Sequence, residues 1–218
     1  MSDSWYKVDN VAKVFLATAS QRDPRVFRIS CTLNEEIDPD TLNEALRSTA
    51  QEWPQFQVTL HRGLFWHYFE STDQLPTAQP ETKAPCAPLY TPERRNKLIY
   101  RVTYFGARIN LEMFHAITDG NGGLLYLKSI VRNYLALRHP GEMENVPSPN
   151  SASAGDMAQD SFRNFYEGTK RKKSAKKPKV YRPHGFLPYS QLQFFEGHLS
   201  AKEVLARAHE LDVSLTSY

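Results

Sequence analysis

The sequence has few cysteines and no long apolar run, and both absences narrow the classes of protein to which it can belong. Cys31 and Cys86 are the only cysteines among 218 residues, and neither lies in a CxxC or other metal-binding pattern. We therefore expect two free, partly buried thiols. No stretch approaches the roughly 20 apolar residues that span a bilayer, and the N-terminal residues lack the basic and apolar regions of a secretory signal. These features predict a cytoplasmic protein without stable membrane insertion.

Several common site motifs are also missing. The sequence contains no phosphate-binding loop, no dinucleotide fingerprint and no nucleophile elbow. Two of the seven histidines flank an expected hairpin, and four more are scattered without the spacing of metal ligands. These six are His61, His67, His139, His184, His198 and His209. We therefore expect no metal site, which leaves His115 as the histidine of interest.

The composition is that of a globular protein with one unusual segment. Apolar residues make up 40% and aromatic residues 12%, which is too much for a disordered chain. The net charge of +3 arises from residues 170–182, which hold eight basic side chains and no acid. This segment could be a solvated loop, a patch for anionic lipid or nucleic acid, or an attractor for the phosphates of coenzyme A. It lacks interleaved aromatic residues, so we expect no nucleic-acid partner.

Local patterns predict strands that pair with near neighbours, and helices on one face of them. Residues 25–33 alternate apolar and polar side chains, as a half-buried strand does. A helix should begin after Asp38, with Pro39 in its first turn, and end before Pro54. The other expected segments are a strand or short apolar segment at 11–17, strands at 56–62 and 64–69, a surface loop at 72–96, strands at 98–105 and 108–114, and a helix from about 120 to 138.

The remaining chain predicts a linker and the beginning of a further unit. A strand is expected at 190–199, and Ser200 and Glu203 form a capping box for a helix up to Leu211. Ser214 or Thr216 resembles the cap of a helix that is not completed, so we expect the chain to be cut from something longer. The element order predicts an α+β fold, a two-layer sandwich with a mostly antiparallel mixed sheet. We divide the chain into a first lobe at 1–145, a linker at 146–184 and the start of a second lobe at 185–218.

His115 carries the strongest chemical signal. It follows the expected strand 108–114 directly and precedes a glycine-rich loop and a helix, a position where rigid elements hold an exposed side chain. A neutral imidazole there could take a proton from an attacking hydroxyl, amine or thiol. Asp119 could hold the loop through an arginine, and Gly120, Gly122 and Gly123 permit tight turns and the close approach of a substrate. The alternative is a structural loop histidine followed by an aspartate that caps the helix.

The segment Phe114-His-Ala-Ile-Thr-Asp-Gly120 resembles the HxxxDG motif of chloramphenicol acetyltransferases, nonribosomal peptide condensation domains, wax ester synthases and alcohol acetyltransferases. Two further segments are similar to sequences in these proteins. Residues 52–63, which begin Glu-Trp-Pro-Gln-Phe, resemble a strand entry that precedes the motif. Residues 9–15, Asp-Asn-Val-Ala-Lys-Val-Phe, resemble a segment of bacterial alcohol acetyltransferase-like proteins. The resemblance covers most of residues 6–140 and, more weakly, residues 185–218.

This resemblance implies a chloramphenicol acetyltransferase-like lobe and a transferase activity. His115 and Asp119 would be the catalytic residues, with His115 as the general base and Asp119 chiefly structural and paired with an arginine, for which we favour Arg28 over Arg25. Gly120 would shape the loop, and Gly122 and Gly123 would line the substrate site. The co-substrate would be acetyl-CoA or another acyl-CoA, without a metal, and the acceptor a small alcohol or amine.

In this superfamily the substrate tunnel lies between two lobes, so the partner would be a missing C-terminal lobe or further copies of the chain. The chain has Phe114 where many members of the superfamily have a second histidine. The alternative to an acyltransferase is a non-catalytic module of the same fold that binds a ligand or self-associates.

Overall fold

The computed structural model describes residues 5–64, 66–91, 94–143, 146–147, 149 and 197–218. The chain divides into two units, Met1–Ala175 and Lys176–Tyr218. The domain boundaries expected at 145/146 and 184/185 lie outside the described residues, as does the basic segment 170–182.

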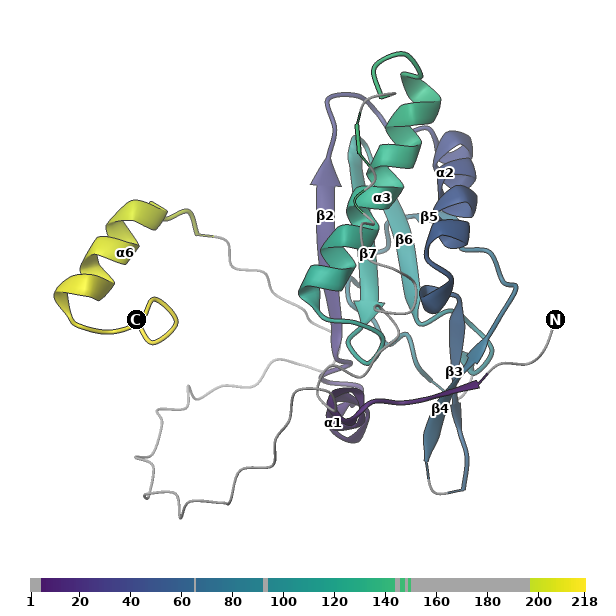
Figure 1. Cartoon of the computed structure of the whole chain (residues 1–218), viewed down its shortest axis with the longest axis horizontal. Coiled ribbons are helices and arrows are strands. Elements are labelled where there is room, and N and C mark those ends of the chain that lie inside the picture. Colours follow the sequence, from purple (N-terminus) through teal and green to yellow (C-terminus); the bar gives the residue numbers. More distant parts are fainter. Residues whose placement is uncertain (1–4, 65, 92–93, 144–145, 148, 150–196) are drawn as a thin grey trace. The chain divides into compact units, whose positions relative to one another are not determined.

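A four-stranded sheet forms the centre of the first unit. Its strand order is β2 (Val26–Thr32), β7 (Arg108–Phe114), β6 (Tyr100–Phe105) and β5 (Ala78–Pro80). The first three strands pair antiparallel, and β5 runs parallel to β6. Two helices, α2 (Pro39–Glu52) and α3 (Gly120–Arg138), lie side by side over one face of this sheet (Figure 1). The predicted two-layer α+β fold with a mixed sheet is confirmed.

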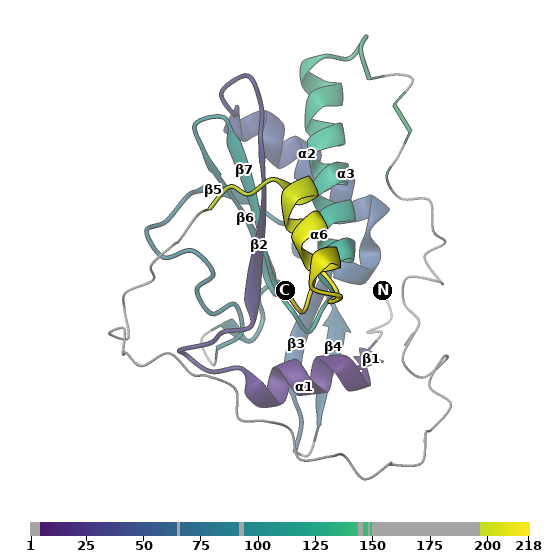
Figure 2. The same ribbon diagram turned by 90° about the vertical axis from the view of Figure 1, so that its left-hand side faces the viewer.

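A second, three-stranded sheet was not expected from the sequence. Its order is β1 (Trp5–Lys7), β4 (His67–Ser71) and β3 (Val58–Arg62), and the short 3-10 helix η1 (Pro54–Phe56) leads into it from α2. The β3–β4 hairpin and helix α1 (Asn10–Thr18) lie at the same end of the four-stranded sheet (Figure 2).

Two sequence-based expectations were wrong. Residues 11–17 were expected as a strand or apolar segment, but they lie in α1, because the Asp9 carboxylate caps a helix by accepting a hydrogen bond from the Ala12 amide at 2.6 Å. Residues 72–96 were expected as a loop alone, but they contain β5. The Asn43 side chain holds that strand by accepting a bond from the Ala78 amide at 2.8 Å.

Helix α3 is joined to the rest of the core by buried polar contacts as well as by apolar packing. The Trp53 indole donates to the Ser129 hydroxyl at 2.9 Å, which ties the end of α2 to α3. The Tyr126 hydroxyl donates to that of Tyr100 at 2.9 Å, and burial raises the pKa of Tyr100 to about 12. Buried polar groups that are paired in this way favour a single helix position, since each would be costly to leave unpaired.

The second unit is described only in its last part. Helix α6 (Ala201–Glu210) begins at the predicted cap, where the Ser200 hydroxyl accepts a bond from the Glu203 amide at 3.4 Å. Of the strand expected at 190–199, residues 197–199 form none, and the rest lie outside the described residues. Within the described ranges, no helix combines the length and the apolar character needed to cross a membrane.

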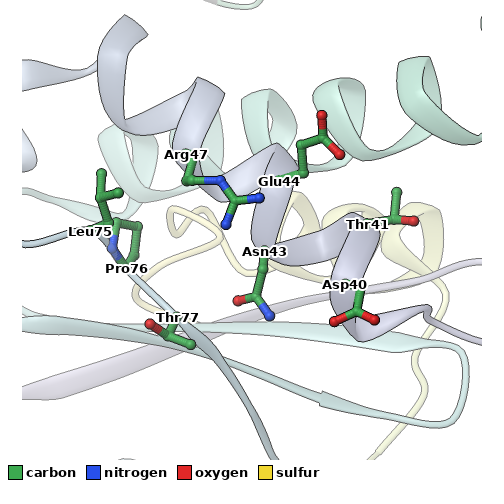
Figure 3. A pocket seen from close by; sticks show the side chains of 8 residues that line it. All are labelled: Asp40, Thr41, Asn43, Glu44, Arg47, Leu75, Pro76 and Thr77. Carbon is green, nitrogen blue, oxygen red and sulfur yellow. The ribbon is translucent and has the colours of Figure 1, made fainter.

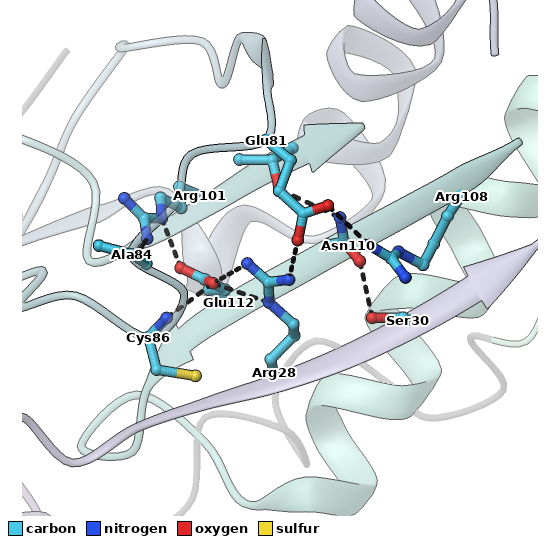
Figure 4. A network of polar contacts seen from close by, with 10 residues as sticks. Arg28, Ser30, Glu81, Ala84, Cys86, Arg101, Arg108, Asn110 and Glu112 are labelled. Atoms are coloured by element: carbon cyan, nitrogen blue, oxygen red, sulfur yellow. Dashed lines mark hydrogen bonds and ion pairs between the residues drawn. The ribbon is translucent and has the colours of Figure 1, made fainter. Parts of the chain in front are cut away.

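The sheet face opposite the helices carries a buried charge network centred on Glu112 of β7 (Figure 4). Arg28 of β2 donates to Glu112 Oε1 from Nε at 2.8 Å, Arg101 of β6 pairs with Oε2, and the Cys86 amide donates to Oε1 at 2.8 Å. Arg28 also pairs with Glu81. Burial lowers the pKa of Arg28, but the two carboxylates outweigh this effect, so the net pKa is raised.

We expect Glu112→Gln to destabilise the protein by about 3–5 kcal/mol, because it leaves two partly buried guanidinium groups without their shared counter-charge. The free energy of unfolding in urea measures this effect. The matched control is Glu44→Gln on the exposed side of α2, which we expect to change stability by less than about 0.5 kcal/mol. Equal effects of the two substitutions would show that the network does not support the sheet.

Candidate active site

His115 lies immediately beyond β7, as the sequence predicted. Its backbone amide donates to the Arg25 carbonyl at 2.8 Å, which extends the β2–β7 pairing by one bond and fixes the start of the loop. Residues 115–119 then form the connection to α3. The imidazole is therefore attached to backbone that is held on one side by the sheet and on the other by a helix.

Two phenylalanine rings enclose the imidazole of His115. Phe15 of α1 stacks on it with ring centroids 4.0 Å apart and an interplanar angle of 12°. Phe27 of β2 contacts it at 5.0 Å and 60°. Within this enclosure Nδ1 is buried and has no hydrogen-bond partner among the described residues. Of the two ring nitrogens, Nε2 is therefore the candidate for exchanging a proton with a bound molecule.

Neither phenylalanine was recognised as part of the site from the sequence. Phe27 was placed only on the buried face of its strand, and Phe15 only within a segment of family resemblance. The signal that could have found Phe27 is strand register, because it lies opposite Met113, two residues before His115. Phe15 had no such signal, since α1 was not recognised as a helix.

Asp119 serves as the N-cap of α3. Its Oδ1 accepts a hydrogen bond from the Gly122 amide at 2.8 Å, and its backbone carbonyl accepts one from Gly123 at 3.0 Å. This is the structural role that the sequence allowed as the alternative, and it fixes the direction in which the loop leaves His115. A direct part for Asp119 in catalysis remains a prediction.

The expected pairing of Arg28 with Asp119 was wrong. Arg28 does point away from the Phe27 face, as its position in the strand implied, but it bonds with Glu112 and Glu81 on the opposite side of the sheet. Arg25, the second choice, forms an ion pair with Asp23 at 3.1 Å. The alternation of side chains along the strand predicted the correct face for Arg28. Its acidic partners lie in segments far away in the sequence.

The three glycines after Asp119 differ in what surrounds them. A Cβ atom on Gly123 would lie 2.8 Å from the Phe27 ring, so this glycine lets α3 approach β2 closely. A Cβ on Gly122 would meet the Thr118 hydroxyl at 2.0 Å, while Gly120 has open space around it. These contacts give Gly122 and Gly123 a packing role. Their part in binding a substrate remains a prediction.

A surface pocket of about 580 Å³ lies elsewhere in the first unit (Figure 3). It is lined by side chains of α2 and of the segment before β5, and none of the predicted site residues belongs to it. The lining residues are Asp40, Thr41, Asn43, Glu44, Arg47, Leu75, Pro76 and Thr77. Among the described residues, no group of histidine, cysteine, aspartate and glutamate side chains is arranged to hold a metal ion. Cys31 and Cys86 are free and partly buried, and burial raises the pKa of both thiols.

Two solved structures show where this fold occurs. The starter condensation domain of the rhizomide synthetase RzmA matches with a TM-score of 0.50 and 12% identity, over 63% of this chain and 39% of that chain. The epimerization domain from the third module of tyrocidine synthetase B matches with a TM-score of 0.52 and 12% identity, over 72% and 40%. The sequence matches no family profile and no curated protein.

These matches show that the chain has the α/β fold found in condensation-type domains. The chain spans about two fifths of the length of these domains, since it covers 39% and 40% of them. At this level of identity the likeness concerns the fold, and the chemistry has to be argued from the residues around His115.

We expect Gly123→Ala to destabilise the protein by about 1–3 kcal/mol, because the added methyl group forces the Phe27 ring or α3 to move. The matched control, Gly120→Ala at the start of the same helix, should leave stability unchanged or raise it by up to about 1 kcal/mol. Urea unfolding of both variants provides the comparison. An equal response at the two positions would contradict the close packing of α3 on β2.

Proposed function

We propose that this chain carries the catalytic histidine of an acyltransferase that moves an acyl group from an acyl-CoA to an alcohol or amine. The observation that carries the proposal is the setting of His115. Its ring is held between Phe15 and Phe27, and Nδ1 is buried without a partner among the described residues. A histidine presented in this way at a strand end can act as a general base through Nε2.

In the proposed reaction, Nε2 of His115 takes the proton of the acceptor hydroxyl or amine as the acceptor attacks the thioester carbonyl. The new ester or amide bond forms, the carbon–sulfur bond breaks, and the thiolate of coenzyme A receives the proton from the imidazolium. No covalent intermediate with the protein is needed. The donors that stabilise the oxyanion belong, in this proposal, to another part of the protein. The rigid connection between β7 and α3 determines which positions the imidazole of His115 can reach.

The choice of acyl-CoA as donor, and of an alcohol or amine as acceptor, rests on the resemblance of the sequence to alcohol acetyltransferase-like proteins. The fold that the chain shares with condensation-type domains supports acyl transfer as the general type of reaction. Because the chain covers only 39% and 40% of two such domains, we propose that a second lobe or a further copy of the chain completes the tunnel around His115.

A non-catalytic binding module is the second candidate, and helix α1 favours it. Six of the nine residues of this helix are apolar, yet only Ala12 is buried, and Val11 and Val14 are 47% and 59% exposed. An apolar helix surface of this kind is suited to contact with another lobe, another copy or an apolar ligand. Under this alternative the protein binds its partner without turning over a thioester.

We expect His115→Ala to lower kcat/KM by about 10²–10⁴-fold, the contribution typical of a positioned general base. The assay is the release of free coenzyme A thiol from an acyl-CoA in the presence of an alcohol or amine. His139→Ala is the control, because His139 follows the C-terminal end of α3, where it pairs with Glu35 at 3.1 Å, whereas His115 precedes the other end of this helix. Turnover that persists in His115→Ala would exclude the proposed base, and binding without turnover in the unaltered protein would favour the binding module.

A further inference from the structure

Basic and hydroxyl-bearing side chains gather at the edge of a second apolar cluster, which lies between the β3–β4 hairpin, α1 and the end of β7. Strand register pairs Arg62 of β3 with His67 of β4. The His67 ring contacts the ring of Tyr90 edge-on at 6.0 Å. Arg95 follows on a tight turn in which the Arg94 amide donates to the Thr91 carbonyl at 2.9 Å. We call Arg62, His67, Tyr90 and Arg95 the basic rim.

No described acidic group neutralises this rim. Arg62 and Arg95 form no ion pair or hydrogen bond with a described side chain. The nearest carboxylate along the hairpin, that of Glu70, lies on the other face of the strands, where it pairs with His61 at 2.9 Å. This arrangement contrasts with the Glu112 network, in which every arginine has a carboxylate. Among the described residues, the rim therefore presents two guanidinium groups without an acidic partner, beside two further hydrogen-bond donors.

The arginines of the rim lower the pKa values of its other two members, His67 and Tyr90. Burial lowers the pKa of His67, and the neighbouring Arg62 lowers it further. Burial raises the pKa of Tyr90, while Arg62 and Arg95 oppose that shift. Strand register and the ring contact place Arg62, His67 and Tyr90 together, and Arg95 lies five residues after Tyr90 in the chain.

The rim is connected to the candidate active site through the apolar cluster. The Tyr90 ring stacks on Phe114 with centroids 6.2 Å apart, and Phe114 is the residue before His115. Phe15, which stacks on the imidazole, packs against the same cluster. This mostly buried cluster thus has His115 at one part of its border and the basic rim at another, and Phe15 and Tyr90 are among its partly buried members.

We propose that the basic rim binds a phosphate group of the thioester donor, so that the border of the apolar cluster lies between the phosphate and the reacting end at His115. Guanidinium groups with adjacent hydroxyl and imidazole donors suit a phosphate oxyanion, because they supply both charge and directed hydrogen bonds. The inference rests on the proposed function, since it assigns the donor of that same site. The phosphate belongs either to coenzyme A or to a phosphopantetheine arm on a carrier protein, which share a 4′-phosphate.

The test is calorimetric titration of the 218-residue chain with coenzyme A, 4′-phosphopantetheine and phosphate-free pantetheine. Arg62→Glu and Arg95→Glu should each weaken coenzyme A binding by about tenfold or more and leave pantetheine binding unchanged. Arg47→Glu, an exposed position on α2, is the charge-matched control and should bind all three as the parent does. Addition of coenzyme A should also raise the pKa of His67 measured by NMR, because an anion stabilises the imidazolium.

The outcomes distinguish the phosphate site at the basic rim from the role of His115 as the general base. Equal losses for coenzyme A and phosphopantetheine place the contact at the shared 4′-phosphate, and a loss for coenzyme A alone places it at the nucleotide phosphates. If both rim variants bind coenzyme A like the parent and the pKa of His67 does not move, the rim is not a phosphate site, even if His115→Ala abolishes turnover. If the rim variants lose binding while His115→Ala remains active, the phosphate site stands and the proposed base is wrong.

Discussion

The packing of Phe27 between α3 and His115 is the constraint on which the rest of the site depends. The β2–β7 ladder places Phe27 opposite Met113, so its ring reaches both the imidazole beyond the end of β7 and the backbone of Gly123. Gly123 permits this contact because it has no Cβ, and the cap at Asp119 sets where α3 begins. The same strand turns Arg28 to the other face, where it supports Glu112. The two faces of β2 thus position the site and stabilise the sheet beneath it.

Local patterns predicted much of the fold. The alternation in residues 25–33, the cap at Asp38 and the long apolar stripe after Asp119 depend on neighbouring residues alone, and the structure contains the corresponding strand and helices. The location of His115 at a strand end followed from the same patterns, because a strand and a helix bracket it. The fold class was predictable for this reason, and so was the cap at Ser200.

The features that were not predicted depend on contacts between distant residues. Helix α1 is the exception, because its signal was local: Asp9 caps the helix through the amide of Ala12, three residues later, and this cap was not recognised in the sequence. The three residues of β5 are held by Asn43, which lies 35 positions earlier. Arg28 meets Glu81 and Glu112, which lie 53 and 84 positions away, and no local rule selects these acids over Asp119. The aromatic enclosure of His115 likewise required the three-dimensional placement of α1.

The most direct test of this account is a crystal structure of the protein with a non-reactive acyl thioester analogue and an acceptor alcohol. We predict that the acceptor oxygen lies within about 2.6–3.2 Å of His115 Nε2, the reach of a hydrogen bond to a general base. The thioester carbonyl should face that oxygen, and the Phe15 and Phe27 rings should still bracket the imidazole. A thioester bound away from the end of β7, with His115 contacting neither substrate, would contradict the assignment.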